Sequence, residues 1–179
     1  IGFVFAKKSK RFISYDMAKA LKKRLDKRVK AVGVFVNESI ENIIYLVRND
    51  IIDLIQLHGD EDSEYISNLK NYVNTPVIKA FRIKSKSDIN NLYKEGSDFI
   101  LLDAGAGDGK TLDESILKDF KGDYFLAGGL SPDNICEKIN TLHPFGVDVS
   151  SGIETDGKKD ADKMRKFVKL VREVENERN

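Results

Sequence analysis

The chain has 179 residues, of which 41% are hydrophobic and 33% are charged, and the two signs of charge almost cancel at a formal net charge of +1. This length and apolar content suffice for a folded domain with a sizeable core, and they exclude a disordered chain. The small net charge provides no field for nucleic acid or an anionic membrane, and no apolar run has the length of a membrane span. The single cysteine, Cys136, excludes an intrachain disulfide, which fits a reducing cytoplasm.

Seven short apolar runs alternate with segments of helical periodicity along the chain. The runs place Val, Ile, Leu and Phe on consecutive positions, as in strands buried on both faces of a parallel sheet. The expected strands are Gly2–Phe5, Ala31–Val36, Asp53–Leu57, Pro76–Ala80, Asp98–Leu102, Asp123–Ala127 and Gly146–Val149. The expected helices are Tyr15–Leu25, Glu38–Asn49, Glu64–Tyr72, Lys86–Lys94, Leu112–Phe120, Pro132–Leu142 and Ala161–Val174. Ser131 is the expected N-cap of the helix that begins at Pro132.

The spacing of these elements predicts a TIM (β/α)8-type barrel. The strand-to-strand interval is roughly 25 residues, the size of one strand–helix unit, and eight units would need about 200 residues. We therefore expect about seven parallel strands in a single barrel domain over residues 1–179 that lacks its first unit, because the chain opens with Ile1 inside an expected strand. An open doubly wound sheet is the competing fold, but its glycine-rich fingerprint after the first strand is absent.

Glycines and serines follow the last two expected strands. Gly128 and Gly129 follow the sixth strand, where they would let the backbone approach a ligand closely and lead into the positive end of a helix. Ser150, Ser151 and Gly152 follow the seventh strand and supply hydroxyl and N–H donors. Barrels commonly bind phosphate in the loops after their last two strands, so the two loops together predict a phosphate site.

Other residues near strand ends allow two interpretations each. Asp103 is either a general acid, with a pKa raised by the apolar strand before it, or a carboxylate that caps a turn. Arg11 is either a surface charge or a bidentate ligand for a carboxylate. His58 is best explained as a structural hydrogen-bonding residue, and Cys136 as a packing residue on a helix. His58 and His143 are far apart with no cysteine cluster, which argues against a zinc site.

A series of segments in a fixed order carries a family resemblance. They are Gly2–Phe5, Ser9–Arg11, Val32–Asn37, Gln56–Gly59, Leu101–Asp103, Leu126–Leu130 and Gly146–Glu154. In these segments, which extend over essentially the whole chain, the sequence resembles the phosphoribosylanthranilate isomerase family of tryptophan biosynthesis. The resemblance implies an Amadori rearrangement of N-(5-phosphoribosyl)anthranilate to 1-(2-carboxyphenylamino)-1-deoxyribulose 5-phosphate, with no metal or organic cofactor.

The resemblance also implies a role for each candidate residue. Asp103 would be the general acid that protonates the ring oxygen of the sugar, and Arg11 would bind the anthranilate carboxylate. Asp148 would bond polar atoms of the substrate. The residues implied around the phosphate are Gly128, Gly129, Ser150, Ser151 and Gly152. The expected partner is therefore a phosphorylated small molecule, and the sequence gives no indication of an oligomeric state.

The sequence departs from the family in two places. Family members begin with a strand of the type Lys-Ile-Cys-Gly, whose cysteine is the general base; the chain has no such segment, and Cys136 lies in the wrong context to replace it. We therefore expect the chain as given to bind phosphate weakly and to be poorly active or inactive. The family's Gly-Thr-Gly is Gly107-Asp108-Gly109 here, and its Phe-Asp-Trp is Leu112-Asp113-Glu114.

Two classes of rival function remain at this point. A metal-dependent sugar-phosphate epimerase should place several His and Asp ligands at strand ends, where this chain has only His58 among its histidines. A relative of indole-glycerol-phosphate synthase should place several Lys and Glu residues there, and Lys79 is the comparable candidate. The second class is a non-catalytic module that keeps the phosphosugar site without the chemistry.

Overall fold

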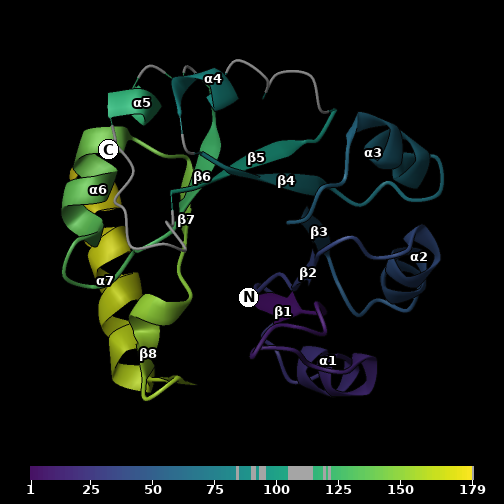
Figure 1. Ribbon diagram of the computed structural model, residues 1–179. Helices are drawn as coiled ribbons and strands as arrows, with labels where there is room; N and C mark the ends of the chain where they lie inside the picture. Colours follow the sequence, from purple (N-terminus) through teal and green to yellow (C-terminus); the bar gives the residue numbers. More distant parts are fainter. Residues whose placement is uncertain are drawn as a thin grey trace. The chain divides into compact units, whose positions relative to one another are not determined.

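Seven strands form one sheet in the described part of the chain, in the order β1 to β7 (Figure 1). Parallel pairing is observed from β1 to β4 and between β6 and β7. The strands are β1 (Gly2–Val4), β2 (Val32–Phe35), β3 (Leu54–Leu57), β4 (Val77–Arg82), β5 (Phe99–Asp103), β6 (Tyr124–Ala127) and β7 (Gly146–Asp148). The helices are α1 (Tyr15–Lys22), α2 (Ile40–Arg48), α3 (Ser63–Lys70), α4 (Lys86–Ile89), α5 (Ser115–Lys118), α6 (Ile135–Leu142) and α7 (Ala161–Arg178). The computed structural model describes residues 1–83, 85–89, 92, 96–104, 115–118, 120 and 122–178.

The expected elements are confirmed, with changes at their ends. Each strand from β1 to β7 lies within two residues of its expected bounds, and the strand expected at Ala31–Val36, for example, is observed at Val32–Phe35. The last helix continues beyond the expected Val174 to Arg178. The helices expected at Lys86–Lys94 and Leu112–Phe120 are described only in part, so their remaining residues lie outside the described ranges.

The chain divides into two compact units. Unit 1 consists of Ile1–Phe81 and Leu92–Ile100, and unit 2 of Arg82–Asn91 and Leu101–Asn179. Unit 1 contains β1 to β3 and α1 to α3, and unit 2 contains β6, β7, α6 and α7. That residues 1–179 form one domain stays a prediction.

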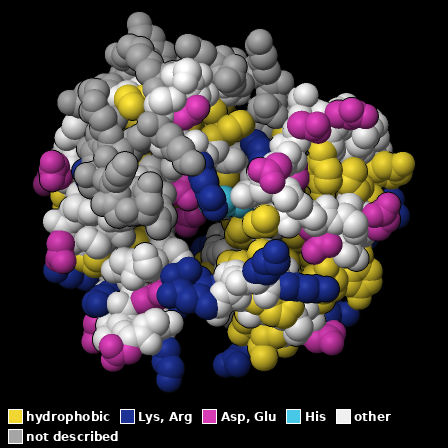
Figure 2. Space-filling model, viewed as in Figure 1, with side chains coloured by type: hydrophobic (Ala, Val, Ile, Leu, Met, Phe, Trp, Pro, Cys, Tyr) yellow, Lys and Arg dark blue, Asp and Glu magenta, His cyan; other side chains and the backbone are white. Residues whose placement is uncertain are grey.

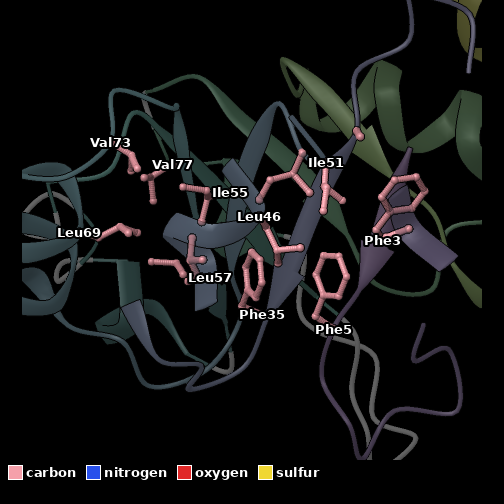
Figure 3. Close-up of a cluster of buried hydrophobic side chains, with 14 of the residues drawn as sticks. Phe3, Phe5, Phe35, Leu46, Ile51, Ile55, Leu57, Leu69, Val73 and Val77 are labelled. Carbon is pink, nitrogen blue, oxygen red and sulfur yellow. The ribbon is translucent and has the colours of Figure 1, made fainter. Parts of the chain in front are cut away.

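The core of unit 1 lies between its strands and its helices (Figure 3). Phe35 and Leu57 occupy the same register on β2 and β3, so their side chains leave the sheet on the same face. Both are fully buried, together with Leu46 of α2 and Leu69 of α3. The ring of Phe5 stacks on that of Phe35, with centroids 5.3 Å apart and planes 20° apart. The consecutive apolar residues of these strands are thereby explained by burial under helices.

Polar side chains cap the three helices of unit 1. Ser14, Ser39 and Asp62 precede α1, α2 and α3, and each accepts a hydrogen bond from the backbone N–H three residues ahead. Such a cap satisfies one of the N–H groups that a helix leaves without an intrahelical acceptor. The helices therefore begin where the sequence offers a short polar side chain.

The start of α6 in unit 2 corrects one expectation. Ser131 was expected to cap a helix beginning at Pro132, but α6 begins at Ile135 and its N-cap is Asn134. The Asn134 side chain accepts a hydrogen bond from the Ser131 N–H (2.9 Å) and donates one to the Gly129 carbonyl (2.9 Å). These local bonds hold residues 131–134 in a turn, which competes with helix formation.

A short hairpin between β7 and α7 was not expected from the sequence. It consists of β8 (Glu154–Thr155) and β9 (Lys158–Lys159), which pair antiparallel. Asp156 and Gly157 form its two-residue turn, and both have positive φ (51° and 75°), as a type I′ turn requires. The Asp-Gly pair at this position is the turn signal that the sequence carried.

The surface mixes charges of both signs. Figure 2 shows Lys and Arg side chains interspersed with Asp and Glu over the face in view, in agreement with the small net charge. Among the described helices, none combines the length and the apolar content needed to cross a membrane.

The burial of Leu46 on α2 and the partial exposure of Leu21 on α1 predict different losses of stability for the same Leu-to-Ala substitution. Leu46 is fully buried, and Leu46→Ala is expected to lower the free energy of unfolding by about 3 kcal/mol, because it removes apolar contacts and leaves a cavity. Leu21 on α1 is 36% exposed, and Leu21→Ala should cost less than about 1 kcal/mol. Urea unfolding measures both values, and equal losses would contradict the assignment of the core.

Candidate active site

The carboxyl ends of three neighbouring strands meet in unit 2. The Ala104 N–H, directly after β5, donates a hydrogen bond to the Ala127 carbonyl at the end of β6 (2.9 Å). Ala127 is in turn the register partner of Asp148 at the end of β7. Asp103 and Asp148 therefore lie on the two strand ends that flank the end of β6. In parallel α/β folds this edge of the sheet carries the ligand site.

The two loops expected to bind phosphate are in backbone contact. A Cβ atom added to Gly152 would lie 1.8 Å from the Leu130 carbonyl oxygen and 3.0 Å from the Ser131 Cα, so only glycine fits. In the other loop, Gly128 and Gly129 both have positive φ (94° and 64°), a conformation that other L-residues rarely adopt. The juxtaposition of the loops, expected from their positions in the chain, is therefore observed.

The edge of these loops is open to a ligand. A Cβ at Gly129 would meet no atom of the described residues within 4 Å, and Gly129 is exposed. Ser150 and Ser151 are exposed as well. Backbone N–H groups and hydroxyls at such a place can donate hydrogen bonds to the oxygens of an anion.

Asn134 supports the first loop, and the sequence analysis did not single it out. By bonding both the Gly129 carbonyl and the Ser131 N–H, its side chain spans the loop from the α6 side. Asparagine is a frequent turn residue because its short amide bonds nearby backbone groups, and this was the available signal. Asn134 therefore helps to fix the shape of the loop.

Arg11 is the predicted site residue that belongs to unit 1. Arg11 follows β1 and is half-buried, and its backbone N–H donates a hydrogen bond to the Ser9 hydroxyl (3.1 Å). The structure thus brings together Asp103, Asp148 and the two loops within unit 2, while the role of Arg11 stays a prediction.

The other candidates have structural explanations. The Gln56 side-chain amide lies within hydrogen-bond distance of Nδ1 of His58 (3.2 Å), which agrees with the expected hydrogen-bonding role. Cys136 lies half-buried on α6. In the described ranges, no three His, Cys, Asp or Glu side chains gather as metal ligands would. Asp108, its flanking glycines and residues 112–114 lie outside those ranges.

A buried ion pair in unit 1 was missed by sequence reasoning. Lys79 on β4 donates hydrogen bonds to the Glu61 carboxylate (3.1 Å) and to the Gly59 carbonyl (2.7 Å). The exposed fractions of the two charged side chains are 5% and 1%. The Glu61 carboxylate also accepts the N–H groups of Asn37 (2.7 Å) and Gly59 (2.8 Å). The pair therefore joins the segments that follow β2 and β3, and both oxygens of its carboxylate accept hydrogen bonds.

A family model for N-(5'phosphoribosyl)anthranilate (PRA) isomerase matches residues 1–170. The chain belongs to this family. It is 44% identical over 180 residues to the N-(5'-phosphoribosyl)anthranilate isomerase of Endomicrobium trichonymphae, with 97% of this chain and 87% of that protein covered. It is also 44% identical over 181 residues to the corresponding protein of Thermoanaerobacter sp. (strain X514), with the same coverage.

Solved structures of the family have the same fold. The phosphoribosyl anthranilate isomerase of Thermotoga maritima superposes with a TM-score of 0.83 at 37% identity, covering 96% of this chain and 86% of that one. TrpF of Jonesia denitrificans gives a TM-score of 0.83 at 33% identity, covering 98% and 86%. These likenesses confirm the barrel-type parallel α/β fold expected from the sequence.

The close contact of the two loops predicts that Gly152 tolerates no side chain. Gly152→Ala should lower the free energy of unfolding by about 3 kcal/mol or more, because the backbone of Leu130 must move. The control is Gly2→Ala, whose methyl group would meet Val34 at an ordinary 3.6 Å and should change stability by less than about 0.5 kcal/mol. Thermal unfolding followed by circular dichroism compares the two, and a tolerated Gly152→Ala would argue against the contact.

The buried ion pair predicts strong coupling between its partners. Glu61→Gln should cost about 3–5 kcal/mol, because it leaves the Lys79 ammonium buried without a counter-charge. Adding Lys79→Met removes that charge, and the double variant should recover much of the lost stability. Urea unfolding of the wild type, both single variants and the double variant gives the coupling free energy. Additive losses would show that the two charges do not interact.

Proposed function

We propose that the protein acts as a phosphoribosylanthranilate isomerase in tryptophan biosynthesis. Its reaction would convert N-(5-phosphoribosyl)anthranilate into 1-(2-carboxyphenylamino)-1-deoxyribulose 5-phosphate. The observation that carries the proposal is the backbone contact of Gly152 with Leu130, which joins two donor-rich loops beside the strand end of Asp103. Membership in the family supports the same reaction.

The two loops would bind the phosphate of the substrate. The donors that we assign to it are the backbone N–H groups and hydroxyls of Gly128, Gly129, Ser150, Ser151 and Gly152. A phosphate dianion gains strong hydrogen bonds from several converging donors, and glycine lets it reach the backbone. A related phosphoribosyl anthranilate isomerase, 36% identical with a TM-score of 0.80, has been solved in complex with reduced 1-(o-carboxyphenylamino)-1-deoxyribulose 5-phosphate.

Asp103 would supply the proton that opens the sugar ring. Protonation of the ring oxygen allows the bond between that oxygen and the anomeric carbon to break, and the anthranilate nitrogen then carries a double bond to this carbon. Loss of a proton from the neighbouring carbon gives an enol, which tautomerises to the ketone. A carboxylic acid at a partly buried strand end suits the first step, because burial favours its neutral form.

The remaining parts of the substrate would be bound by single side chains. Arg11 suits the anthranilate carboxylate, because its guanidinium can form two parallel hydrogen bonds. Asp148 lies at the end of β7, next to the end of β6, and would accept hydrogen bonds from sugar hydroxyls. The rearrangement is redox-neutral overall, so it requires no redox cofactor. A cytoplasmic location, suggested by the single cysteine, is part of the proposal.

The general base of the family is a cysteine in a Lys-Ile-Cys-Gly segment. These 179 residues contain no such segment, and their single cysteine, Cys136, lies on α6. The proposal therefore predicts little turnover by these 179 residues alone, and restored turnover once the first strand–helix unit of a relative is fused ahead of Ile1. Growth of a tryptophan auxotroph that lacks the isomerase tests both forms. Rescue by the unextended chain would refute the assigned base, and failure of both forms with phosphate still bound would favour a non-catalytic binding module.

Asp103→Asn provides the test of the general acid. In the extended, active form it should lower kcat by about 100-fold or more, since a positioned general acid contributes roughly 10²–10⁴. The matched control is Asp133→Asn, because the Asp133 side chain is 86% exposed and only a 3.4 Å surface ion pair with Lys166 is lost. Steady-state assays of the purified proteins measure both. Equal activity of the two variants would remove Asp103 from the mechanism.

A further inference from the structure

We propose that Lys159 is a positioning residue that orients the Ser151 N–H for phosphate binding. The inference rests on the proposed function, because it deepens the role of the loop Ser150–Gly152. Lys159 lies on β9, nine residues after Ser150, and donates a hydrogen bond from Nζ to the Ser150 carbonyl (2.7 Å). Its ammonium group also pairs with Glu154 Oε1 (3.1 Å).

The hairpin brings Lys159 back to this loop. Glu154 and Lys159 are register partners in the β8–β9 pair, so the turn at residues 156–157 reverses the chain and returns it beside the loop. The Asp160 N–H donates to the Ile153 carbonyl (2.9 Å), and Lys163 Nζ donates to the Glu154 carbonyl (2.8 Å). Hydrogen bonds to the Thr155 hydroxyl and to the Lys163 N–H lower the pKa of Asp160, so its carboxylate remains charged at neutral pH. The hairpin is thus attached at both ends.

The geometry of the peptide bond connects Lys159 to the ligand side of the loop. The Ser150 carbonyl and the Ser151 N–H belong to one planar trans peptide, in which they point in opposite directions. A cation that holds the carbonyl therefore directs the N–H away from Lys159. A charge-assisted hydrogen bond to the carbonyl also polarises the peptide and strengthens its N–H as a donor.

Glu154 keeps the ammonium group in place. The Glu154 side chain is only 7% exposed, so the surrounding residues restrict the position of its carboxylate. The Lys159 side chain is 44% exposed and is restrained by its pairing with this carboxylate. Because the Glu154 carboxylate is nearly buried, removal of the Lys159 cation also affects stability. Phosphate affinity and the Ser151 amide shift are therefore the measurements that separate a positioning role from a purely structural one.

Lys158 provides a matched control on the same strand. Successive side chains of a strand leave opposite faces, so Lys158 points away from the face of Lys159. Among the described residues, the Lys158 side chain makes no hydrogen bond or ion pair, and the residue is exposed. Lys158→Met and Lys159→Met change the net charge equally but differ in their contact with Ser150.

The test measures ligand binding and the Ser151 amide in the full chain. Isothermal titration with inorganic phosphate should show about a 10-fold weaker Kd for Lys159→Met and an unchanged Kd for Lys158→Met. Anthranilate, which has a carboxylate but no phosphate, should bind all three proteins alike. In ¹H–¹⁵N spectra without ligand, the Ser151 amide proton should shift upfield in Lys159→Met only, because its peptide is less polarised. Lys159→Arg, which keeps the cation, should recover part of both effects.

The outcomes separate this inference from the proposed function. Equal phosphate affinity in both Met variants, with an unmoved Ser151 amide, would overturn the role of Lys159 while leaving the phosphate site intact. Absence of phosphate binding in the wild type, with the Ser151 shift still present in Lys159→Met, would overturn the phosphate site but support the orientation of the peptide by Lys159. If Lys159→Met unfolds because the nearly buried Glu154 carboxylate loses this cation, the same measurements are made on the double variant Glu154→Gln with Lys159→Met, which removes that charge.

Discussion

The contact between the Gly152 backbone and the Leu130 carbonyl is the constraint on which the candidate site depends. Two loops that belong to different strand–helix units can bind one phosphate only if their backbones approach each other without side chains between them. Gly152 permits this approach, and Gly128 and Gly129 give the first loop its left-handed backbone. The price of so many glycines is conformational entropy, which the surrounding structure must offset.

Side-chain bonds to loop backbone offset part of that entropy. Asn134 bonds two backbone groups of the first loop, and Lys159 bonds one carbonyl of the second. In unit 1, the buried Glu61 and Lys79 fix the segments after β2 and β3 in a comparable way, through the N–H groups of Asn37 and Gly59. Both units therefore use polar side chains to hold backbone groups at strand ends.

Sequence reasoning succeeded where a signal is local and failed where a partner is distant. The apolar runs identified β1 to β7 to within two residues, because burial under helices requires consecutive apolar residues. Ser131 was wrongly assigned as the cap of α6, since the three-residue spacing to Asn134 stabilises a turn that the local pattern did not exclude. Lys79 was considered only as a candidate comparable to the strand-end lysines of an indole-glycerol-phosphate synthase relative, because Glu61 lies eighteen residues before it and nothing in the spacing links them.

The sequence by itself determined the order of the elements, the parallel fold class and the chemistry available at the strand ends, because periodicity and residue type are properties of short segments. Only the tertiary structure decided which of these residues meet. Three contacts show this. Neighbouring strands bring Ala104 to Ala127 and Gly152 to Leu130, and the hairpin brings Lys159 to Ser150. Such contacts depend on how the segments pack in three dimensions, and linear spacing along the chain does not encode them.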